Sequence, residues 1–312
     1  MRKYFFLVLC LAIATVLWTQ SKSEFMGASE VSQIEPLQKT AELNWWANET
    51  LTVEGHGSIY AGEKDLNRAK IFSKRAAMID GYRNLARAAG KVQITAKETL
   101  RNERIEVLIR GAEMISETYD ERGNCTVVLS VPIYGVTNSI AKAAFTPVEK
   151  EDFPAPSREV ATKGNYTGLI IDCGDLELNP VLSPVIRDAQ NQSIYAYEKL
   201  DYDKVIARGM IGYVEKKSLN SSDAGEIMLL HGRTENKFVQ IGSELLAEAD
   251  KNLLRAGTNP LIIKAESLGD DNSCPVISAE DADKILVENL STHFLDEGSV
   301  VFTSNRIRGM RM

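Results

Sequence analysis

The chain has 312 residues, of which 44% are hydrophobic and 25% are charged, and its formal net charge is −7. This composition is typical of a globular protein and excludes disorder of the whole chain. The length suits two domains rather than one. The acidic balance argues against a nucleic-acid-binding protein, which usually carries a basic face and a high isoelectric point.

The first 23 residues have the layout of an export signal. Two cations, Arg2 and Lys3, precede an uncharged, mainly apolar run over residues 4–18, and a short polar stretch follows. The run is shorter than the roughly 20 residues of a membrane-spanning helix. We therefore expect residues 1–23 to be a signal peptide that directs the protein to the periplasm or cell envelope. An uncleaved anchor, with residues 4–18 in the membrane, is the alternative.

Residues 24–43 are polar and lack periodicity, and we interpret them as a tether. The following segment, residues 44–140, is predicted to be a small α+β domain with the order β-α-β-(α)-β-β. A mostly antiparallel sheet would carry one long helix on one face, because a single amphipathic helix cannot bury its apolar side alone. Strands are expected over residues 51–60, 92–99, 112–119 and 125–134, and helices over residues 64–89 and 102–110.

The long helix has apolar residues at three- and four-residue steps, a spacing that predicts one buried face. These residues are Leu66, Ala69, Phe72, Ala76, Ile79, Tyr82 and Ala86. Gly55 and Gly57 in the preceding strand begin a dinucleotide-loop pattern, but Tyr60 occupies the place of the third glycine. We interpret the two glycines as sites of close helix packing or of a bulge.

Residues 141–163 contain three prolines among charged residues and are predicted to be an exposed linker. Residues 164–304 are predicted to be a second α+β domain, again a small, mostly antiparallel sheet with one or two helices on one face. Its strands are expected over residues 167–171, 193–197, 205–215, 226–230, 261–265 and 300–303, and its helices over residues 245–254 and after a cap at Ser278. Residues 305–312 form a basic tail.

Sequence motifs of common enzymes and metal sites are missing from the chain. It contains no G-x-S-x-G, no H-E-x-x-H and no C-x-x-C, so we expect no catalytic, cofactor-binding or metal-binding residues. Three acids, Asp172, Asp175 and Glu177, follow a predicted strand. We expect a solvated turn there, and acid–base chemistry of a hydrolase is the alternative.

Two pairs of residues are candidates for contact or cross-linking. Trp45 and Trp46 are adjacent, and neighbours on a strand face opposite sides. We therefore expect one ring to anchor the core and the other to pack at its edge, with a partner or glycan contact through an exposed ring as the alternative. Cys173 and Cys274 are expected to be buried thiols, with a disulfide between them as the alternative that export would permit.

Several segments of the first domain carry a family pattern. They are Thr52-Val53-Glu54-Gly55-His56-Gly57, Arg68-Ala69, Arg75-Ala76-Ala77, Asn84-Leu85, Gly111-Ala112 and Cys125-Thr126-Val127-Val128-Leu129-Ser130-Val131. Over residues 45–136 the chain resembles the Lpp-twenty lipoprotein-like domain and is similar to the N-terminal domain of flagellar assembly protein T. The resemblance implies an exported protein of the cell envelope or flagellar basal ring with no catalytic residues. Cys10 lies inside the apolar run, so the lipid anchor of the lipoprotein members is not expected.

Together these features predict a non-enzymatic envelope protein that acts in structure or assembly. It would contact other envelope proteins, or a second copy of itself, through its sheet edges and the tryptophan pair. A module that binds cell-wall glycan, such as peptidoglycan, or a small ligand is the second hypothesis, and an unrecognised hydrolase is the third.

Overall fold

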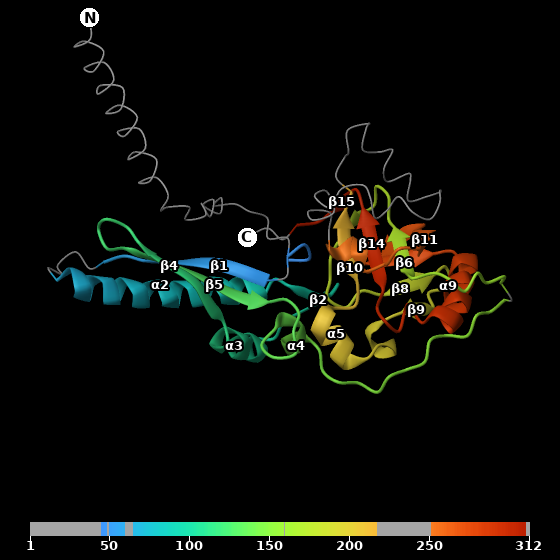
Figure 1. Cartoon of the computed structure of the whole chain (residues 1–312), viewed down its shortest axis with the longest axis horizontal. Coiled ribbons are helices and arrows are strands. Elements are labelled where there is room, and N and C mark those ends of the chain that lie inside the picture. Colours follow the sequence, from blue (N-terminus) through green and yellow to red (C-terminus); the bar gives the residue numbers. More distant parts are fainter. Residues whose placement is uncertain (1–44, 49, 60–64, 159, 217–250, 310–312) are drawn as a thin grey trace, which may run out of the picture. The chain divides into compact units, whose positions relative to one another are not determined.

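A computed structural model describes residues 45–48, 50–59, 65–158, 160–216 and 251–309, all within one compact unit. The α+β class is confirmed, since the described chain contains both helices and strands (Figure 1). The predicted signal peptide, the tether and the strand over residues 226–230 lie outside the described residues.

The first half is an antiparallel sheet with a long helix on one face (Figure 1). Its strands are β1 (Thr50–Gly57), β4 (Glu113–Tyr119) and β5 (Cys125–Pro132), in the order β1-β5-β4, and its main helix is α2 (Leu66–Ala89). The predicted β4–β5 hairpin is confirmed. Its turn is closed by the carboxylate of Asp120, which accepts hydrogen bonds from the amides of Arg122 and Asn124.

Smaller elements surround this sheet. They are β2 (Gln93–Thr95), β3 (Glu98–Thr99), α3 (Asn102–Arg110) and α4 (Ile140–Ala144). The helix predicted over residues 102–110 is confirmed with the same bounds. The strand predicted over residues 92–99 is instead the two-stranded hairpin β2–β3, because a turn at Ala96 and Lys97 reverses the chain.

The main sheet of the second half is parallel throughout. Its strands are β6 (Gly168–Asp172), β10 (Gly212–Glu215), β11 (Pro260–Lys264) and β14 (Val300–Ser304), in the order β10-β14-β6-β11. This differs from the mostly antiparallel sheet expected there. The strands are short apolar runs joined by long connections, and both features are typical of parallel sheets.

Helices and core residues cover both faces of the parallel sheet. The helices are α5 (Tyr202–Arg208), α8 (Lys251–Leu254) and α9 (Ala279–Thr292). One face, with Leu169 and Phe302, joins the main apolar core, and the other packs against residues around α8. Among the helices of the described chain, none has the length and apolar character that crossing a bilayer requires.

Two of these helices show how local chemistry decides structure. The predicted cap of α9 is confirmed, since the Ser278 hydroxyl accepts a hydrogen bond from the amide of Asp281 at 3.1 Å. The extended segment predicted over residues 205–215 is wrong in its first part. Asp201 caps α5 through the amide of Lys204, and the chain leaves that helix at Gly209 with a φ of 76°.

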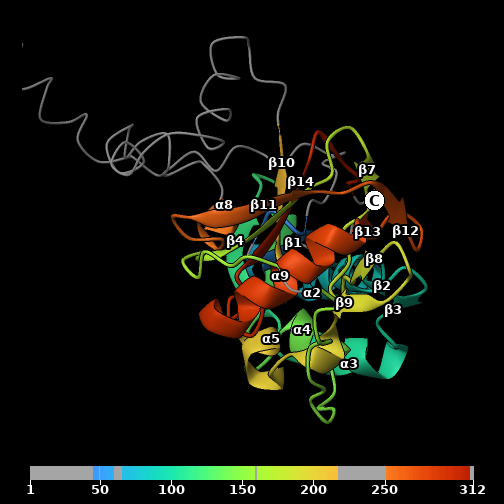
Figure 2. The same cartoon turned by 90° about the vertical axis from the view of Figure 1, so that its right-hand side faces the viewer.

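The remaining strands form two small sheets. They are β7 (Glu177–Leu178), β8 (Ile186–Asp188), β9 (Ser193–Tyr195), β12 (Ser267–Gly269), β13 (Cys274–Ile277) and β15 (Arg306–Ile307), and a 3-10 turn, η1, covers Tyr197–Lys199. The order β12-β13-β8-β9 is shown in part in Figure 2, and β15 pairs with β7. The described start of the predicted basic tail is thus part of a strand.

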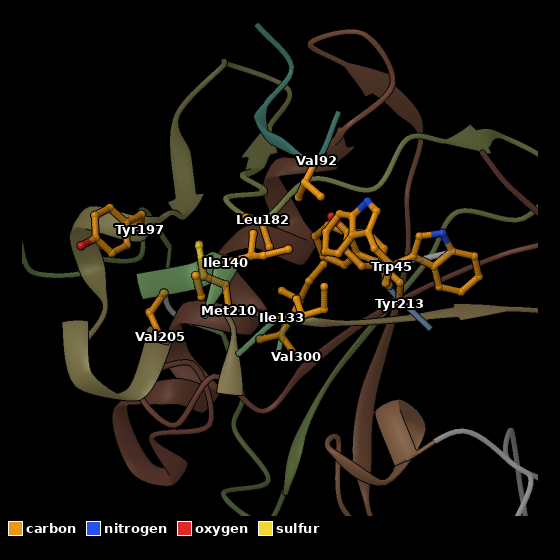
Figure 3. Packing of buried hydrophobic residues seen from close by; sticks show 14 of the residues in the cluster. Trp45, Val92, Ile133, Ile140, Leu182, Tyr197, Val205, Met210, Tyr213 and Val300 are labelled. Atoms are coloured by element: carbon orange, nitrogen blue, oxygen red, sulfur yellow. The ribbon is translucent and has the colours of Figure 1, made fainter. Parts of the chain in front are cut away.

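The two halves share one apolar core. Figure 3 shows Val92 and Ile133 of the first half beside Leu182 and Tyr213 of the second. Hydrogen bonds also cross the junction: the Leu182 amide donates to the carbonyl of Gln93 at 2.9 Å. The division into two domains, with boundaries at residues 140 and 164, stays a prediction.

The predicted linker is exposed along most of its length but is fixed to α9. Residues 146–158 and 160–164, here called the strap, meet two buried acids of that helix. Asp283 accepts hydrogen bonds from the amide and hydroxyl of Ser157. Glu288 accepts three, from the Thr162 hydroxyl and from the amides at positions 163 and 164. The connection is therefore an ordered part of the second half.

Candidate docking surface

The Trp45–Trp46 pair is buried at the start of the described chain. The two residues lie in a turn before β1, and only 4% and 9% of their surfaces are exposed. Trp45 meets the ring of Tyr213 edge-on, with 6.5 Å between the ring centroids (Figure 3). The burial of both rings contradicts the alternative of an exposed ring as a partner contact. That alternative assumed a strand, whereas the turn lets both rings enter the core.

The three acids that follow β6 do not converge on one site. Asp172 forms an ion pair with Lys216 at 2.6 Å, across the ends of β6 and β10. Asp175 accepts a hydrogen bond from the side-chain amide of Asn305, and Glu177 pairs with an arginine of the chain's end. Each carboxylate therefore has a separate structural partner.

The three cysteines of the described residues, Cys125, Cys173 and Cys274, are buried and carry free thiols. Cys173 follows β6, Cys274 begins β13, and the structure contains no bond between them. The disulfide considered from the sequence is therefore not formed here. Burial raises the pKa of the Cys173 thiol to about 12 and that of Cys274 to about 11, so both are protonated near neutral pH.

The face of α2 that packs on the sheet is made mainly of small side chains. Its buried members include Ala69, Ser73, Ala77, Gly81 and Leu85, spaced by four residues. On β1, a Cβ atom at Gly55 would overlap the carbonyl of Ala77 and the amide of Gly81, and one at Gly57 would overlap the carbonyl of Ser73. Helix backbone and strand backbone are thus in direct contact, which confirms close packing as the role of the two glycines.

The large apolar side chains of α2 point away from the sheet. The exposed fractions are 54% for Leu66, 66% for Ile71, 46% for Phe72 and 47% for Ile79. The predicted buried face is therefore wrong: of its seven residues only Ala69 is fully buried. Because the glycines of β1 bring the helix backbone so close, only short side chains fit between helix and sheet.

Arginines surround these apolar residues on the solvent side of the helix. We define the outer face of α2 as its exposed residues from position 68 onward: Arg68, Ile71, Phe72, Arg75, Ala76, Ile79, Arg83 and Arg87. This set contains four cations and no acid. The guanidinium of Arg68 lies 5.6 Å from the centroid of the Phe72 ring. Arg75 and Arg83 form no ion pair with any described residue. Figure 1 shows the sheet on one side of α2 and α3 beside its C-terminal part.

The carboxylates nearest to α2 already have partners. Asp80 accepts a hydrogen bond from the amide of His56 at 3.0 Å, at the free edge of β1. At the other edge, Glu117 of β4 pairs with Lys74 at 2.6 Å, and this contact lowers the pKa of Glu117. Glu117 is therefore paired with a cation, whereas Asp80 is held by two uncharged donors, the amide of His56 and the side chain of Asn84. The four arginines dominate the charge of the outer face.

A second basic feature is a hollow of about 610 Å³ between the β2–β3 hairpin, the start of α3 and the end of α4. Lys97, Arg101 and Arg104 line it, together with one acid, Glu98. None of the three cations forms an ion pair within the described part of the chain. The hollow is therefore basic and open to solvent.

Residues 168–306 match a family model described as Treponema pallidum Tp0624, second domain. No curated protein matches the chain. The match begins at the first residue of β6 and ends in β15, so it covers the parallel sheet and does not include α2. This part of the chain is similar to that family.

Sequence reasoning missed the outer face of α2, although a signal was present. Residues 69, 73, 77 and 81 are alanine, serine, alanine and glycine at four-residue steps. Such a row, together with two glycines on a neighbouring strand, is typical of backbones in close contact. The row of large apolar side chains was the more conspicuous pattern in the sequence, and it predicted the wrong buried face.

Proposed function

We propose that the protein is a non-enzymatic component of the cell envelope, acting in structure or assembly, and that it docks through the outer face of α2. The export-signal layout of residues 1–23 supports the envelope location. The resemblance of residues 45–136 to the Lpp-twenty lipoprotein-like domain supports it too, and the same resemblance implies no catalytic residues.

The observation that carries the docking role is the inverted packing of α2. Burying one large apolar side chain stabilises a protein by about 1.5–3 kcal/mol. A helix that served only the fold would bury Phe72 and Ile79, yet α2 buries alanines and exposes both. Clustered exposed apolar residues mark interaction sites in soluble proteins. The outer face of α2 is such a cluster.

One edge of the first sheet offers a second contact. On β1, the Asn84 side chain donates to the carbonyl of Glu54, so α2 already occupies part of that edge. Strand β4, at the opposite edge, pairs with β5 alone among the described residues and exposes Met114 and Ile115. Of the two edge strands of this sheet, β4 is therefore the candidate for pairing with a partner strand.

Site-specific photocrosslinking in intact cells tests the docking role. A photoreactive amino acid replaces Ala76 at the centre of the outer face, and a control chain carries it at Leu290, an exposed residue of α9. We expect covalent adducts from position 76 and few from position 290. Recovery of the unmodified chain alone from both positions, with no covalent adduct of any kind, would contradict the proposal.

A second candidate function is the binding of an anionic cell-wall glycan or small ligand in the basic hollow. Its support is the set of three cations that line this concave surface and form no ion pair with a described residue. Co-sedimentation with purified peptidoglycan, compared between the native chain and Arg101→Gln/Arg104→Gln, tests it. Equal sedimentation of the two chains would show that the hollow does not bind peptidoglycan.

A further inference from the structure

We infer that the outer face of α2 lies on the surface of an anionic lipid bilayer, with Phe72 and Ile79 entering the acyl boundary and the flanking arginines at the lipid phosphates. This inference rests on the proposed docking role and adds the identity of the partner. The contact is separate from the apolar run of residues 4–18.

The positive charge of the outer face favours an anionic partner. The outer face carries four arginines and no carboxylate, while the chain as a whole has a net charge of −7. The local positive charge therefore attracts an anionic surface and orients the protein with this face toward it. A second copy of the chain docked face to face would place arginines against arginines, which disfavours self-association through this face.

The order of side chains around the helix suits an interface between water and lipid. With about 100° of rotation per residue, Phe72, Ala76 and Ile79 form a central apolar row. Arg68 and Arg75 lie on one side of this row and Arg87 lies on its other side, while Arg83 continues the row one turn beyond Ile79. Arginine side chains can extend their charged ends to phosphates while their stems cover apolar surface. This is the arrangement of helices that lie in the plane of a membrane surface.

Shape also favours a bilayer over a protein groove. The outer face is the solvent side of a helix of 24 residues whose other side packs closely on the sheet, and the surface of a helix is convex. A protein partner would need a groove with an apolar floor and acidic walls in register with the arginines. An anionic bilayer supplies phosphates and acyl chains everywhere, so a rigid convex helix needs no shaped receptor.

Binding to vesicles tests the inference on the full chain. Vesicles of phosphatidylcholine with phosphatidylglycerol are compared with vesicles of phosphatidylcholine alone. The apolar variant is Phe72→Ser/Ile79→Ser, the charge variant is Arg75→Gln/Arg83→Gln, and the matched control is Leu290→Ser. We expect roughly tenfold weaker binding to the anionic vesicles for both outer-face variants and no change for the control. Equal binding of all four chains would overturn the inference.

Because residues 4–18 could themselves hold the chain on a vesicle, a second measurement reports on α2 directly. In a Cys10→Ser background the remaining cysteines are buried. A nitroxide spin label is placed on Ala76→Cys, or on Leu290→Cys as the control. On anionic vesicles we expect oxygen in the bilayer to relax the label at position 76 and not the label at position 290. A label at position 76 that stays in water on a bound chain would overturn the inference.

The outcomes separate this inference from the proposed function. Crosslinks from position 76 to a protein, with no lipid contact by the spin label, would keep the docking role and overturn the bilayer as partner. If position 76 gives no crosslinks and makes no lipid contact, both the docking role and the bilayer inference are wrong.

Discussion

The long helix of each half packs on the apolar core with one side, but only α9 is also covered on a second side. Its apolar side chains, such as Ile285 and Leu286, join the core, and the acids Asp283 and Glu288 hold the strap. Helix α2 has the sheet on one side and an outer face of large apolar residues and arginines on the other.

The polar groups of α9 are bound by other parts of the same chain, whereas the outer face of α2 remains exposed to solvent. The strap satisfies the polar groups of α9, and ion pairs such as Lys204–Glu297 at 2.7 Å compensate charges near its end. Beside α2, Glu117 is paired with Lys74 and Asp80 is hydrogen-bonded to the amide of His56, and the outer face itself contains no acid. The family match lies in the completed half, whereas the candidate docking surface lies in the other.

The largest effect is expected where α2 touches β1. Gly57→Ala places a Cβ against the carbonyl of Ser73, which is backbone and cannot turn aside. We expect destabilisation of about 3 kcal/mol or more, because helix and strand must separate. Urea unfolding measures it. The control is Gly269→Ala, where the nearest atoms lie at an ordinary 3.8 Å. A similar small change for both variants would show that the close packing is not essential.

Removing an acid of α9 should detach the strap. Glu288→Ala deletes the acceptor of three hydrogen bonds in a residue that is 1% exposed. We expect a loss of about 2–3 kcal/mol and faster cleavage of the strap by protease. Glu149→Ala, an exposed acid within the strap, serves as the control. If the two variants are cleaved at the same rate, Glu288 does not hold the strap.

The strap contact also predicts a pH dependence of stability. Burial by itself would raise the pKa of Glu288, but hydrogen bonds from the strap lower it below its ordinary value of 4.5. Asp296 behaves alike, because hydrogen bonds from Lys150 and Asn289 outweigh its burial and lower its pKa below 3.8. A carboxyl group whose pKa is lower in the folded protein than in the unfolded protein stabilises the fold at pH values above its unfolded pKa. This stabilisation is lost as the pH falls through its folded pKa.

We therefore expect the free energy of unfolding to decrease as the pH drops below about 4.5. The decrease should be smaller in Glu288→Gln, which lacks the titrating group. Urea unfolding at a series of pH values measures both chains. Parallel curves for the two chains would show that Glu288 gains no stability from being ionised.

The smallest effect on stability is expected at the outer face of α2. Phe72→Ser and Ile79→Ser remove exposed side chains, so each should change the free energy of unfolding by about 0.5 kcal/mol or less. Leu85→Ala, on the buried face of the same helix, should cost about 2–5 kcal/mol. Thermal unfolding of the three variants compares the two faces. A large loss from Phe72→Ser would place its ring in the core.

Features set by neighbours in sequence were predictable. The bounds of α3, the end of α2 near Gly90, the β4–β5 turn and the Ser278 cap depend on residues within a few positions of each other, and the structure confirms them. Local rules of helix capping and turn formation suffice for such elements.

Features set by distant contacts were not predictable in the same way. The buried side of α2 is decided by Gly55 and Gly57, which periodicity within the helix cannot include. The parallel pairing of β6 with β14 joins strands about 130 residues apart. The burial of Trp46 depends on a turn and a core built partly by the second half. Each error came from reading one segment without its partner.

The side chains of Asp80 and Asn84 on the free edge of β1 have a consequence for growth of the sheet. An added strand would find two of the backbone groups there already bonded, so among the described strands of this sheet only β4 keeps an edge open to extension. If β4 of one molecule pairs with β4 of another, both open edges are used at once. Such pairing would end at a closed pair and could not propagate into a fibre.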